Sequence, residues 1–450
     1  MLPTIESLAA SLAAGRISSV ELTTAALARA TAPAGEGARV FTRLDADRAM
    51  ALAQASDLLR ERGLVRSPID GLPVSVKDLF DIGGQTTCAG SVVLSDAAPA
   101  THNAVVVDRL LAAGAVIVGR TNMTEFAFSG LGINPHHGTP RNPWDRGTGR
   151  IPGGSSAGAA VSVTDAMAVA AVGTDTGGSV RIPSALCGLA GFKPTARRIP
   201  TAGTLPLSTS LDSIGPLAAS VRCCEIMDAL LAGEAVPQRA ATDLVDARLA
   251  VPTDVVLNDL DDAVASAFDA ACRILTAAGA RLRRIAIPEF SALPAIHSRG
   301  NLTAAEAWAW HRSLIDTQAS AYDPRVVSRI KLGANMTAAD LIDLVAARQR
   351  WIAGVQARMT GFDALLMPTV PQLAPPIEAL VQDEAAYFRA NGLMLRNPTL
   401  INFLDGCALT LPCQRPGDAP VGLMLAGVGG QDRHILSLGL AIESALDSAP

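Results

Sequence analysis

The sequence predicts an α/β fold built around a largely buried sheet. Segments with helical spacing alternate along the chain with short apolar runs, which is the pattern of strands joined by helices. The runs are almost continuously apolar, as expected of strands that are covered on both faces. No repeat, low-complexity tract or clear linker interrupts the 450 residues, so residues 1–450 are expected to form a single large domain.

Each expected element follows from a local pattern. The first 60 residues are expected to be helical, with one start at Ser18, where a capping serine stands three residues before the acidic Glu21. The apolar runs predict strands at residues 72–76, 115–118, 248–252, 282–287 and 364–367. Helical spacing of the apolar residues predicts helices at residues 103–114, 261–278 and 338–359.

One stretch departs from this alternation. Residues 130–215 are dense in glycine, serine, threonine and proline, and they carry few charges. Such a composition is normally loop, and the low charge argues against a solvated flexible linker. Because long loops in compact domains tend to be functional, we expect this stretch to contribute to a functional site.

The composition excludes several classes of protein. The formal charge is −5 and there is no basic block, which argues against a nucleic-acid binder. The seven cysteines are odd in number and contain no C-x-x-C pair, which fits a reducing cytoplasm better than disulfides or a zinc site. The chain does not begin with a signal peptide pattern, and no apolar run reaches the ~18–20 residues of a membrane span. We therefore expect a cytoplasmic protein that binds neither nucleic acid nor membrane.

Lysine is rare in this sequence. Of the 37 basic residues only Lys77, Lys193 and Lys331 are lysines. Lys77 directly follows the apolar run at residues 72–76. A lysine in that place either extends its side chain to water, which is the commoner case, or is buried with a lowered pKa.

A second segment of interest is the Gly-Gly-Ser-Ser-Ala-Gly run at residues 153–158, which opens an apolar helical stretch. Glycine before and serine at the start suit a helix N-terminus, whose free N–H groups face anionic groups. The alternative is an ordinary serine N-cap after a glycine turn.

A third segment spans residues 173–183. Gly177 and Gly178 stand before Ser179, and two glycines allow the backbone to approach a ligand closely and to aim successive N–H groups at one point. That is the geometry of an oxyanion hole. The alternative is a plain turn bridged by the side chain of Asp175.

Together the three segments resemble the amidase signature family of serine hydrolases. Ser155 and Ser179 stand 179 − 155 = 24 residues apart, as in that family's pattern. Flanking matches lie at residues 119–126, 187–195 and 212–216. The close match covers about residues 67–220, and weaker matches follow at residues 367–369 and 420–423.

The resemblance implies a fold and a layout of the chain. The fold would be a mixed, mostly parallel central sheet covered by helices on both faces. A signature core at about residues 67–220 would follow a helical N-terminal segment at residues 1–60. The substrate pocket would take a variable region at about residues 300–405.

The resemblance also implies a mechanism. Ser179 would attack the carbonyl carbon of a small-molecule carboxamide, with Ser155 as proton bridge and Lys77, made neutral by burial, as base. The acyl-enzyme would then give a carboxylate, and ammonia or an amine would leave, without metal or cofactor. The family holds its bridging serine in a cis peptide bond, so one is expected at Gly154–Ser155.

Backbone and neighbouring side chains would support this chemistry. Asp175 and Arg181 flank the nucleophile and would hold the loop in shape. Ser156 would support the serine network, or would only cap the helix. The backbone N–H groups expected to hold the oxyanion are those of Thr176, Gly177, Gly178 and Ser179.

The substrate pocket is expected to be apolar, which suggests an aryl or alkyl amide. Equally, its candidate residues could be ordinary core residues. The candidates are Phe126, Phe128, Ser129, Trp308 and Phe403.

The main alternative is the glutamine-hydrolysing subunit of a tRNA-dependent amidotransferase. Such subunits usually carry a D-x-x-T motif ahead of an asparagine, with the aspartate seven residues before it. Here Asn402 matches the asparagine, but Leu395 and Pro398 take the other two places. A nucleophile elbow at Ser156 lacks a preceding strand, and an inactive binding protein would not need the three catalytic-type residues. Family members are often dimers, so the resemblance allows a homodimer.

Overall fold

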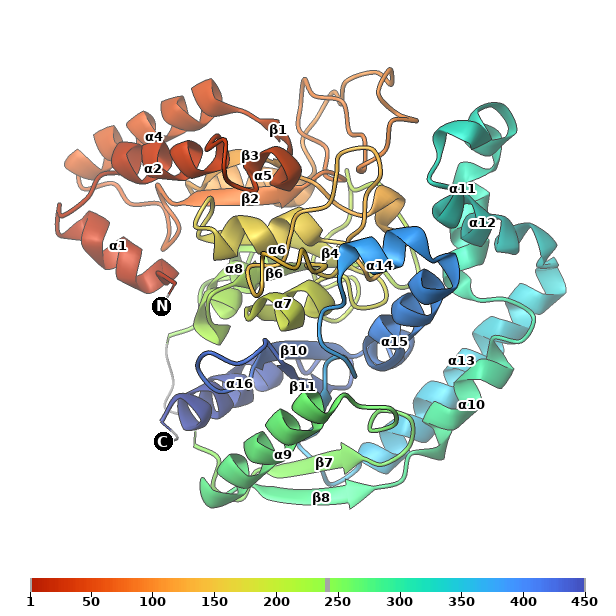
Figure 1. The fold of residues 1–450 in the computed structure, drawn as a ribbon. Helices are drawn as coiled ribbons and strands as arrows, with labels where there is room; N and C mark the ends of the chain where they lie inside the picture. The colour runs from red at the N-terminus through yellow and green to blue at the C-terminus, as the bar shows by residue number, and fades with distance from the viewer. Residues whose placement is uncertain (1, 239–242, 449–450) are drawn as a thin grey trace.

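An eleven-stranded sheet organises the part of the chain that the computed structural model describes, residues 2–238 and 243–448. Its strands lie in the order β1-β3-β2-β4-β6-β5-β10-β11-β9-β7-β8, from the N-terminal strands at the top of Figure 1 to β7 and β8 at the bottom. The strands are β1 (Phe41–Leu44), β2 (Pro73–Lys77), β3 (Val116–Thr121), β4 (Ala170–Asp175), β5 (Ala190–Lys193), β6 (Ser213–Ala218), β7 (Arg248–Pro252), β8 (Arg281–Ile285), β9 (Ala364–Pro368), β10 (Cys407–Pro412) and β11 (Gly422–Gly427).

Helices surround this sheet (Figure 1). The α-helices are α1 (Ile5–Ala13), α2 (Ser19–Ala30), α3 (Gly37–Val40), α4 (Ala46–Glu61), α5 (Val105–Ala112), α6 (Ala157–Thr164), α7 (Arg181–Cys187), α8 (Val221–Ala232), α9 (Asp262–Ala277), α10 (Pro288–Ile296), α11 (Leu302–Gln318), α12 (Pro324–Lys331), α13 (Ala338–Met359), α14 (Ile377–Gln382), α15 (Glu384–Phe403) and α16 (Asp432–Asp447). Short 3₁₀ turns are η1 (Glu125–Ala127), η2 (Ala319–Ala321) and η3 (Leu332–Asn335).

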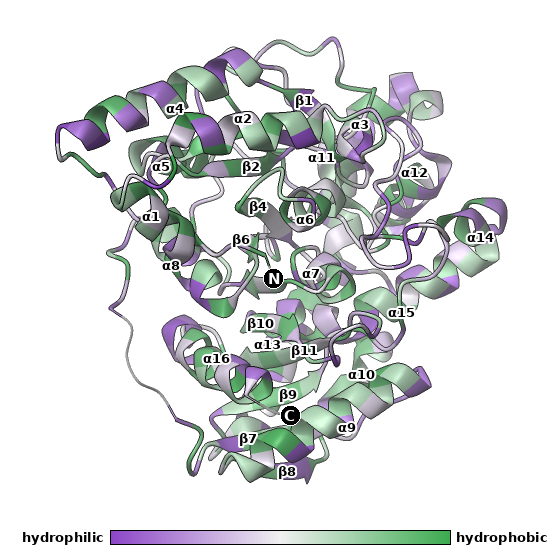
Figure 2. Ribbon diagram, turned by 60° about the vertical axis from the view of Figure 1, so that its left-hand side comes forward, coloured by the Kyte–Doolittle hydropathy of each residue, from purple (hydrophilic) through white to green (hydrophobic). Residues whose placement is uncertain are grey.

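Strand β4 shows that the sheet is buried on both faces. Side chains alternate between the two faces of a strand. Ala170 and Val172 pack into the apolar cluster that includes residues of α8 and α16, whereas Ala171 packs with residues of α6. A strand covered in this way has no polar alternation, which explains the continuous apolar runs in the sequence. In Figure 2 the central strands are largely hydrophobic, while α4 and α14 alternate hydrophobic and hydrophilic residues.

The expected α/β fold with a mixed sheet is confirmed, but the expectation that its strands are mostly parallel is wrong. Six of the ten strand pairings among the described residues are antiparallel and four are parallel. A parallel pair needs a crossover connection, usually a helix, as α5 provides between β2 and β3. No helix intervenes between β5 and β6 or between β10 and β11, and both of these pairs are antiparallel.

Most expected elements lie within a few residues of the predicted bounds, and β7 and α13 coincide with them. The N-terminal segment contains the helices α1 to α4, and it also contains β1, which pairs with β3 and is only four residues long, too short to show a periodicity. The stretch at residues 130–215 is not simply loop, since it contains α6, β4, α7 and β5 and the start of β6.

Close packing explains the small residues of that stretch. A Cβ atom added to Gly158 in α6 would lie 2.3 Å from the carbonyl oxygen of Val40. One added to Gly215 in β6 would lie 2.1 Å from the carbonyl oxygen of Phe192. Glycine in these elements therefore permits close contact of backbones rather than marking a turn.

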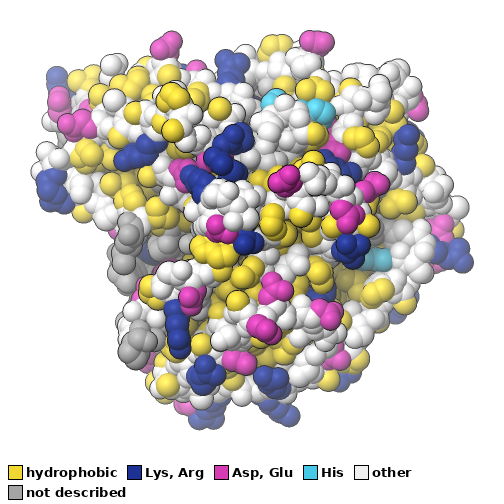
Figure 3. Space-filling model, viewed as in Figure 1, with side chains coloured by type: hydrophobic (Ala, Val, Ile, Leu, Met, Phe, Trp, Pro, Cys, Tyr) yellow, Lys and Arg dark blue, Asp and Glu magenta, His cyan; other side chains and the backbone are white. Residues whose placement is uncertain are grey.

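Charges of both signs are mixed on the face of the molecule that Figure 3 shows. On the face shown in Figure 3, lysine and arginine side chains are interspersed with aspartate and glutamate. Among the described helices, none combines the length and the apolar character needed to cross a membrane.

Two neighbouring strands bring the candidate site together. Strands β2 and β4 pair in parallel, with Val76 opposite Val172. The carboxyl ends of parallel strands meet at one edge of a sheet, which is where α/β proteins usually bind ligands. Lys77 is the last residue of β2 and Asp175 is the last residue of β4, so the first and third sequence segments converge there.

Candidate active site

Lys77 lies fully buried at the end of β2, with 0% of its surface exposed. Its Nζ atom is 2.7 Å from Ser155 Oγ and 2.8 Å from Thr174 Oγ1. Burial lowers the pKa of Lys77 to about 7, and the more distant carboxylates of Asp212 and Asp175 oppose that decrease only in part. Of the two interpretations of this lysine, the buried one holds, and a large share of its amine is neutral near pH 7.

The serine pair precedes helix α6. The Gly154–Ser155 peptide bond is cis, as expected. Ser156 occupies the N-cap position of α6, yet its side chain makes no capping hydrogen bond. Its Oγ donates instead to the carbonyl oxygen of Thr174 at 3.4 Å, and its backbone N–H donates to the carbonyl oxygen of Ser179 at 3.3 Å. Ser156 therefore connects β4 with the loop that carries Ser179.

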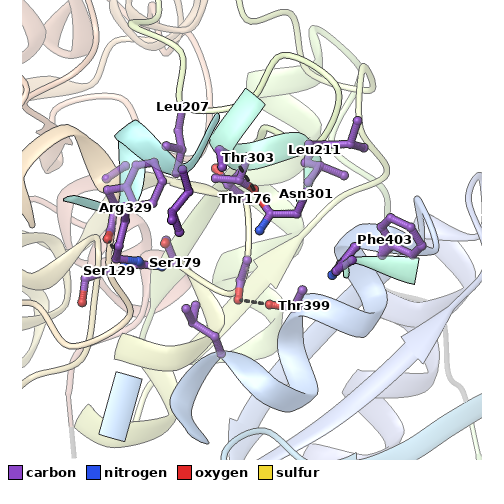
Figure 4. Close-up of a pocket in the computed structure, with 18 residues that line it drawn as sticks. Ser129, Thr176, Ser179, Leu207, Leu211, Asn301, Thr303, Arg329, Thr399 and Phe403 are labelled. Atoms are coloured by element: carbon purple, nitrogen blue, oxygen red, sulfur yellow. Dashed lines mark hydrogen bonds between the residues drawn. The ribbon is translucent and has the colours of Figure 1, made fainter. Parts of the chain in front are cut away.

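Ser179 stands in the loop between β4 and α7. The preceding Gly178 has a φ of +125°, a conformation that residues with a side chain rarely adopt. Ser179 is 3% exposed and lines a cavity, and its Oγ makes no hydrogen bond to any residue that the structure describes (Figure 4). The hydroxyl is therefore free to meet a molecule that enters the cavity.

The backbone N–H groups of this loop differ in what they contact. The N–H of Gly178 donates to Asp175 Oδ1 at 2.9 Å and is therefore occupied. Those of Thr176, Gly177 and Ser179 donate to no residue of the described chain, and these three residues line the cavity. Of the four N–H groups that are expected to hold an oxyanion, those of Thr176, Gly177 and Ser179 thus have no hydrogen-bond partner in the described chain, and that of Gly178 has one.

Asp175 and Arg181 form an ion pair beneath the loop. Both side chains are fully buried, and Arg181 Nη2 is 2.8 Å from Asp175 Oδ1. Asp175 Oδ2 also accepts the backbone N–H of Val180 at 3.2 Å. Burial alone would raise the pKa of Asp175, but Arg181 holds that pKa well below its usual range. A charged Asp175 therefore shapes the loop from within.

Asn402 completes this network, and the sequence did not indicate its contacts. Its Nδ2 donates to Asp175 Oδ1 at 2.9 Å, and its Oδ1 accepts from Arg181 Nη2 at 2.6 Å. Helix α15 is thereby attached to the loop that carries Ser179.

Breaking the ion pair should destabilise the protein. Arg181→Met leaves the carboxylate of Asp175 buried without its counter-ion, so we expect the free energy of unfolding to fall by about 3–5 kcal/mol. Urea denaturation followed by circular dichroism measures this change. Arg281→Met is the matched control, because Arg281 pairs with Asp246 on the surface and its loss should change far less. Equal losses in the two variants would contradict a structural role for the buried pair.

Asp212 links the loop of Ser179 to a wall of the cavity. Its Oδ1 accepts the hydroxyl of Thr176 at 2.5 Å, and its Oδ2 accepts the backbone N–H of Leu207 at 3.0 Å. Burial raises the pKa of Asp212 to about 6. Glu306 of α11 binds the same segment, since its Oε2 accepts the hydroxyl of Ser208 at 2.6 Å.

The cavity beside Ser179 has a volume of about 180 Å³. Of the expected pocket residues, Phe128, Ser129 and Phe403 line it, and Phe126 and Trp308 do not. The lining residues are Ala127, Phe128, Ser129, Thr176, Gly177, Ser179, Leu207, Leu211, His297, Asn301, Leu302, Thr303, Ala304, Arg329, Leu332, Leu395, Thr399 and Phe403. Figure 4 shows them converging from loops and helices far apart in the sequence.

Phe126 belongs to the core instead. It is 1% exposed, and its ring packs edge-on against His311 at 4.4 Å between centroids and lies 5.2 Å from the ring of Tyr322. Trp308 also packs against the apolar core. For these two residues the core interpretation is the right one.

Comparison with known proteins shows which chains this one is similar to. A family model described as Amidase matches residues 21–436. The chain is 37% identical over 407 residues to the 2-amino-5-chloromuconic acid deaminase of Comamonas testosteroni, covering 89% of this chain and 87% of that protein. It is 33% identical over 478 residues to a glutamyl-tRNA(Gln) amidotransferase subunit from Chloroflexus aggregans (strain MD-66 / DSM 9485), covering 99% and 96%. A crystal structure of an amidase superposes with a TM-score of 0.88 at 33% identity, covering 98% of this chain and 99% of that one.

Proposed function

This chain belongs to the amidase family and is an amide hydrolase, and from that premise we propose that it cleaves a small-molecule carboxamide through an acyl-enzyme on Ser179. The products are a carboxylate and ammonia or an amine. The observation that carries the proposal is the contact between the buried, partly neutral amine of Lys77 and Ser155 Oγ.

The proposed reaction has two halves, the acylation of Ser179 and the hydrolysis of the acyl-enzyme. In the first, Ser179 Oγ attacks the carbonyl carbon while its proton passes through Ser155 to the neutral amine of Lys77. The oxyanion that forms accepts hydrogen bonds from the free N–H groups of Thr176, Gly177 and Ser179. The proton returns along the same path to the leaving nitrogen as the C–N bond breaks. In the second half, water attacks the ester with the same assistance and releases the carboxylate.

The size of the cavity favours a small substrate. An apolar cavity of about 150 Å³ holds a molecule of the size of benzene, and this one measures about 180 Å³. The Comamonas relative is named a deaminase of 2-amino-5-chloromuconic acid, which supports a small organic molecule as substrate. The seven cysteines are all free thiols, which supports the proposal of a cytoplasmic enzyme.

The amidotransferase alternative rests on the similarity to the Chloroflexus protein. Glutamine carries an α-ammonium group, and burying that charge requires an anionic partner. No aspartate or glutamate is among the lining residues that the structure describes, and Leu395 lines the cavity where the amidotransferase pattern has its aspartate. The cavity therefore favours an amide without an ammonium group.

Purified chain alone tests the proposal. We expect it to release ammonia from one or more members of a panel of primary amides, anilides and dicarboxylic monoamides, and to be insensitive to chelator. A fluorophosphonate should label Ser179. The proposal fails if no panel member is turned over and Ser179 is not labelled. Turnover of glutamine alone, dependent on a partner protein, would favour the amidotransferase alternative.

The dependence of activity on pH should follow the ionisation of Lys77. Only the neutral amine accepts a proton, so kcat/KM should rise with pH along a limb whose apparent pKa is near 7. The limb is measured with a substrate that does not ionise in this range.

His297 lines the cavity, and a histidine is the usual cause of such a limb. The limb should therefore persist in His297→Asn. Its disappearance in that variant would contradict the assignment to Lys77.

A further inference from the structure

Arg329 stands out among the residues that line the cavity. It lies near the end of helix α12 and shares the cavity with Ser179. Every other lining residue that the structure describes is neutral or is His297, whose pKa is lowered by burial. Figure 4 shows the side chain of Arg329 on the same side of the cavity as Ser129 and Ser179. The cavity therefore contains a single permanent positive charge.

The guanidinium of Arg329 has no counter-ion among the residues that the structure describes. Within the described chain, no carboxylate lies within 4.0 Å of the guanidinium of Arg329. Nη1 donates to the carbonyl oxygen of Phe128, and the guanidinium lies over the ring of Phe128, 4.7 Å from its centroid. A guanidinium has five N–H donors, so most of those on Arg329 are left for a ligand. Burial lowers the pKa of Arg329, which reflects the cost of an unpaired cation in this place.

Arg325, one helical turn earlier, shows what a paired arginine looks like here. Its Nε is 3.0 Å from Asp323 Oδ1 and its Nη2 is 2.9 Å from Asp323 Oδ2, a bidentate ion pair. Arg325 does not line the cavity. Of these two arginines of α12, Arg325 is paired with Asp323, whereas Arg329 lines the cavity without an acidic partner among the described residues.

We propose that Arg329 binds a carboxylate of the substrate, so that the substrate class is a small carboxamide with one carboxylate, such as the monoamide of a short dicarboxylic acid. This inference rests on the proposed function, since it assigns the substrate of the same cavity. The planar fork of a guanidinium matches the two oxygens of a carboxylate.

The rest of the lining agrees with a single negative charge. Among the lining residues that the structure describes, only Arg329 is a permanent cation, whereas a phosphate dianion would require more positive charge. Asn301 accepts the backbone N–H of Ala304 with its Oδ1 at 2.9 Å, which leaves its amide N–H groups for the cavity. Its nitrogen points into the cavity in Figure 4. No acidic side chain of the described lining would repel the carboxylate.

Matched substrates and matched variants test the inference. kcat/KM is measured for succinamic, glutaramic and adipamic acids and for butyramide, valeramide and hexanamide, which replace the carboxylate by a methyl group. The wild-type chain should prefer the best acid over its neutral partner on the order of 100-fold, the size expected of a charge-assisted pair. Arg329→Gln should lower kcat/KM for the acid far more than for its neutral partner, so that the ratio of the two kcat/KM values falls to near 1. Arg329→Lys should retain part of the preference.

Arg325→Gln is the control, because it removes a neighbouring arginine that does not reach the cavity. The ratio of its kcat/KM on the acid to its kcat/KM on the neutral amide should equal that of the wild type. An equal fall on both substrates in Arg329→Gln would assign Arg329 a structural role through Phe128 and would overturn the inference. A wild-type chain without preference for the acid would overturn it as well.

A binding measurement separates this inference from the proposed function. Glutarate, which has no amide to cleave, should protect Ser179 of the wild type from the fluorophosphonate and should not protect Arg329→Gln. If glutarate protects Ser179 of the wild type but not of Arg329→Gln, and no amide is hydrolysed, the result supports the carboxylate site and contradicts the proposed function. If neutral amides are hydrolysed but glutarate does not protect Ser179 of the wild type, the carboxylate site is contradicted and the proposed function is not.

Discussion

Ser179→Ala should abolish amide hydrolysis while the protein remains folded. The variant lacks the oxygen that forms the acyl-enzyme, so kcat should fall by a factor on the order of 10⁴–10⁶. The residual rate would come from the free N–H groups of the loop, which the substitution leaves in place. Initial rates on the best amide of the panel, measured with the urea midpoint of the same preparation, separate loss of chemistry from loss of fold.

Ser156→Ala is the control for that substitution. Ser156 Oγ is also buried beside the site, but within the described chain its only hydrogen bond is to the carbonyl oxygen of Thr174, at 3.4 Å. Its removal should reduce kcat much less than the removal of Ser179. Near-normal turnover by Ser179→Ala, or a fluorophosphonate adduct on Ser156, would show that the nucleophile is a different residue.

Lys77→Met should reduce kcat by a factor on the order of 10³–10⁴, the upper range for a general base. The substitution removes the group that takes the proton from the serines and keeps a side chain of similar length. KM should change little, because Lys77 is not among the residues that line the cavity. The rise of kcat/KM with pH near pH 7 should disappear from the residual activity.

Lys193 provides an unusually close control, because it is the second buried lysine of the chain. Burial lowers its pKa to about 8, and its Nζ donates to the carbonyl oxygens of Pro194 and Gly406 at 2.8 and 2.7 Å. It has no contact with Ser155. Lys193→Met should therefore cost stability, while activity per folded molecule and the alkaline limb remain. If Lys193→Met loses the limb and Lys77→Met keeps it, the base has been assigned to the wrong lysine.

The sequence predicted the parts of the site that lie in short contiguous segments. The loop of Ser179, the serine pair and Lys77 could be recognised because each motif is a few residues long. Arg329 could not be recognised, since its importance depends on the absence of a carboxylate around it and on a cavity formed by segments far apart. The same holds for Asn402, which meets Asp175 across 227 residues of sequence.

The fold was predictable to a similar degree. Apolar runs between helices indicate buried strands, and the structure has strands at those places. They do not indicate direction, because a strand covered on both faces has the same apolar pattern in a parallel and in an antiparallel pair. The strands β5, β6 and β10, which form antiparallel pairs, lie outside the predicted strands, so neither these strands nor their direction was predicted.

The burial of Lys77 also couples the stability of the whole fold to pH. In the unfolded chain the amine is hydrated and its pKa returns to about 10.5, whereas in the folded chain it is about 7. Between these two pH values the unfolded chain holds more protons, so unfolding takes up a proton and the free energy of unfolding rises with pH. From pH ~7 to pH ~10.5 this single group raises the free energy of unfolding by roughly 5 kcal/mol. Below pH ~7 the amine is protonated in both states, so this rise is absent there. The burial that produces a base near neutral pH therefore makes the contribution of Lys77 to the free energy of unfolding smaller under acidic and neutral conditions than under alkaline ones.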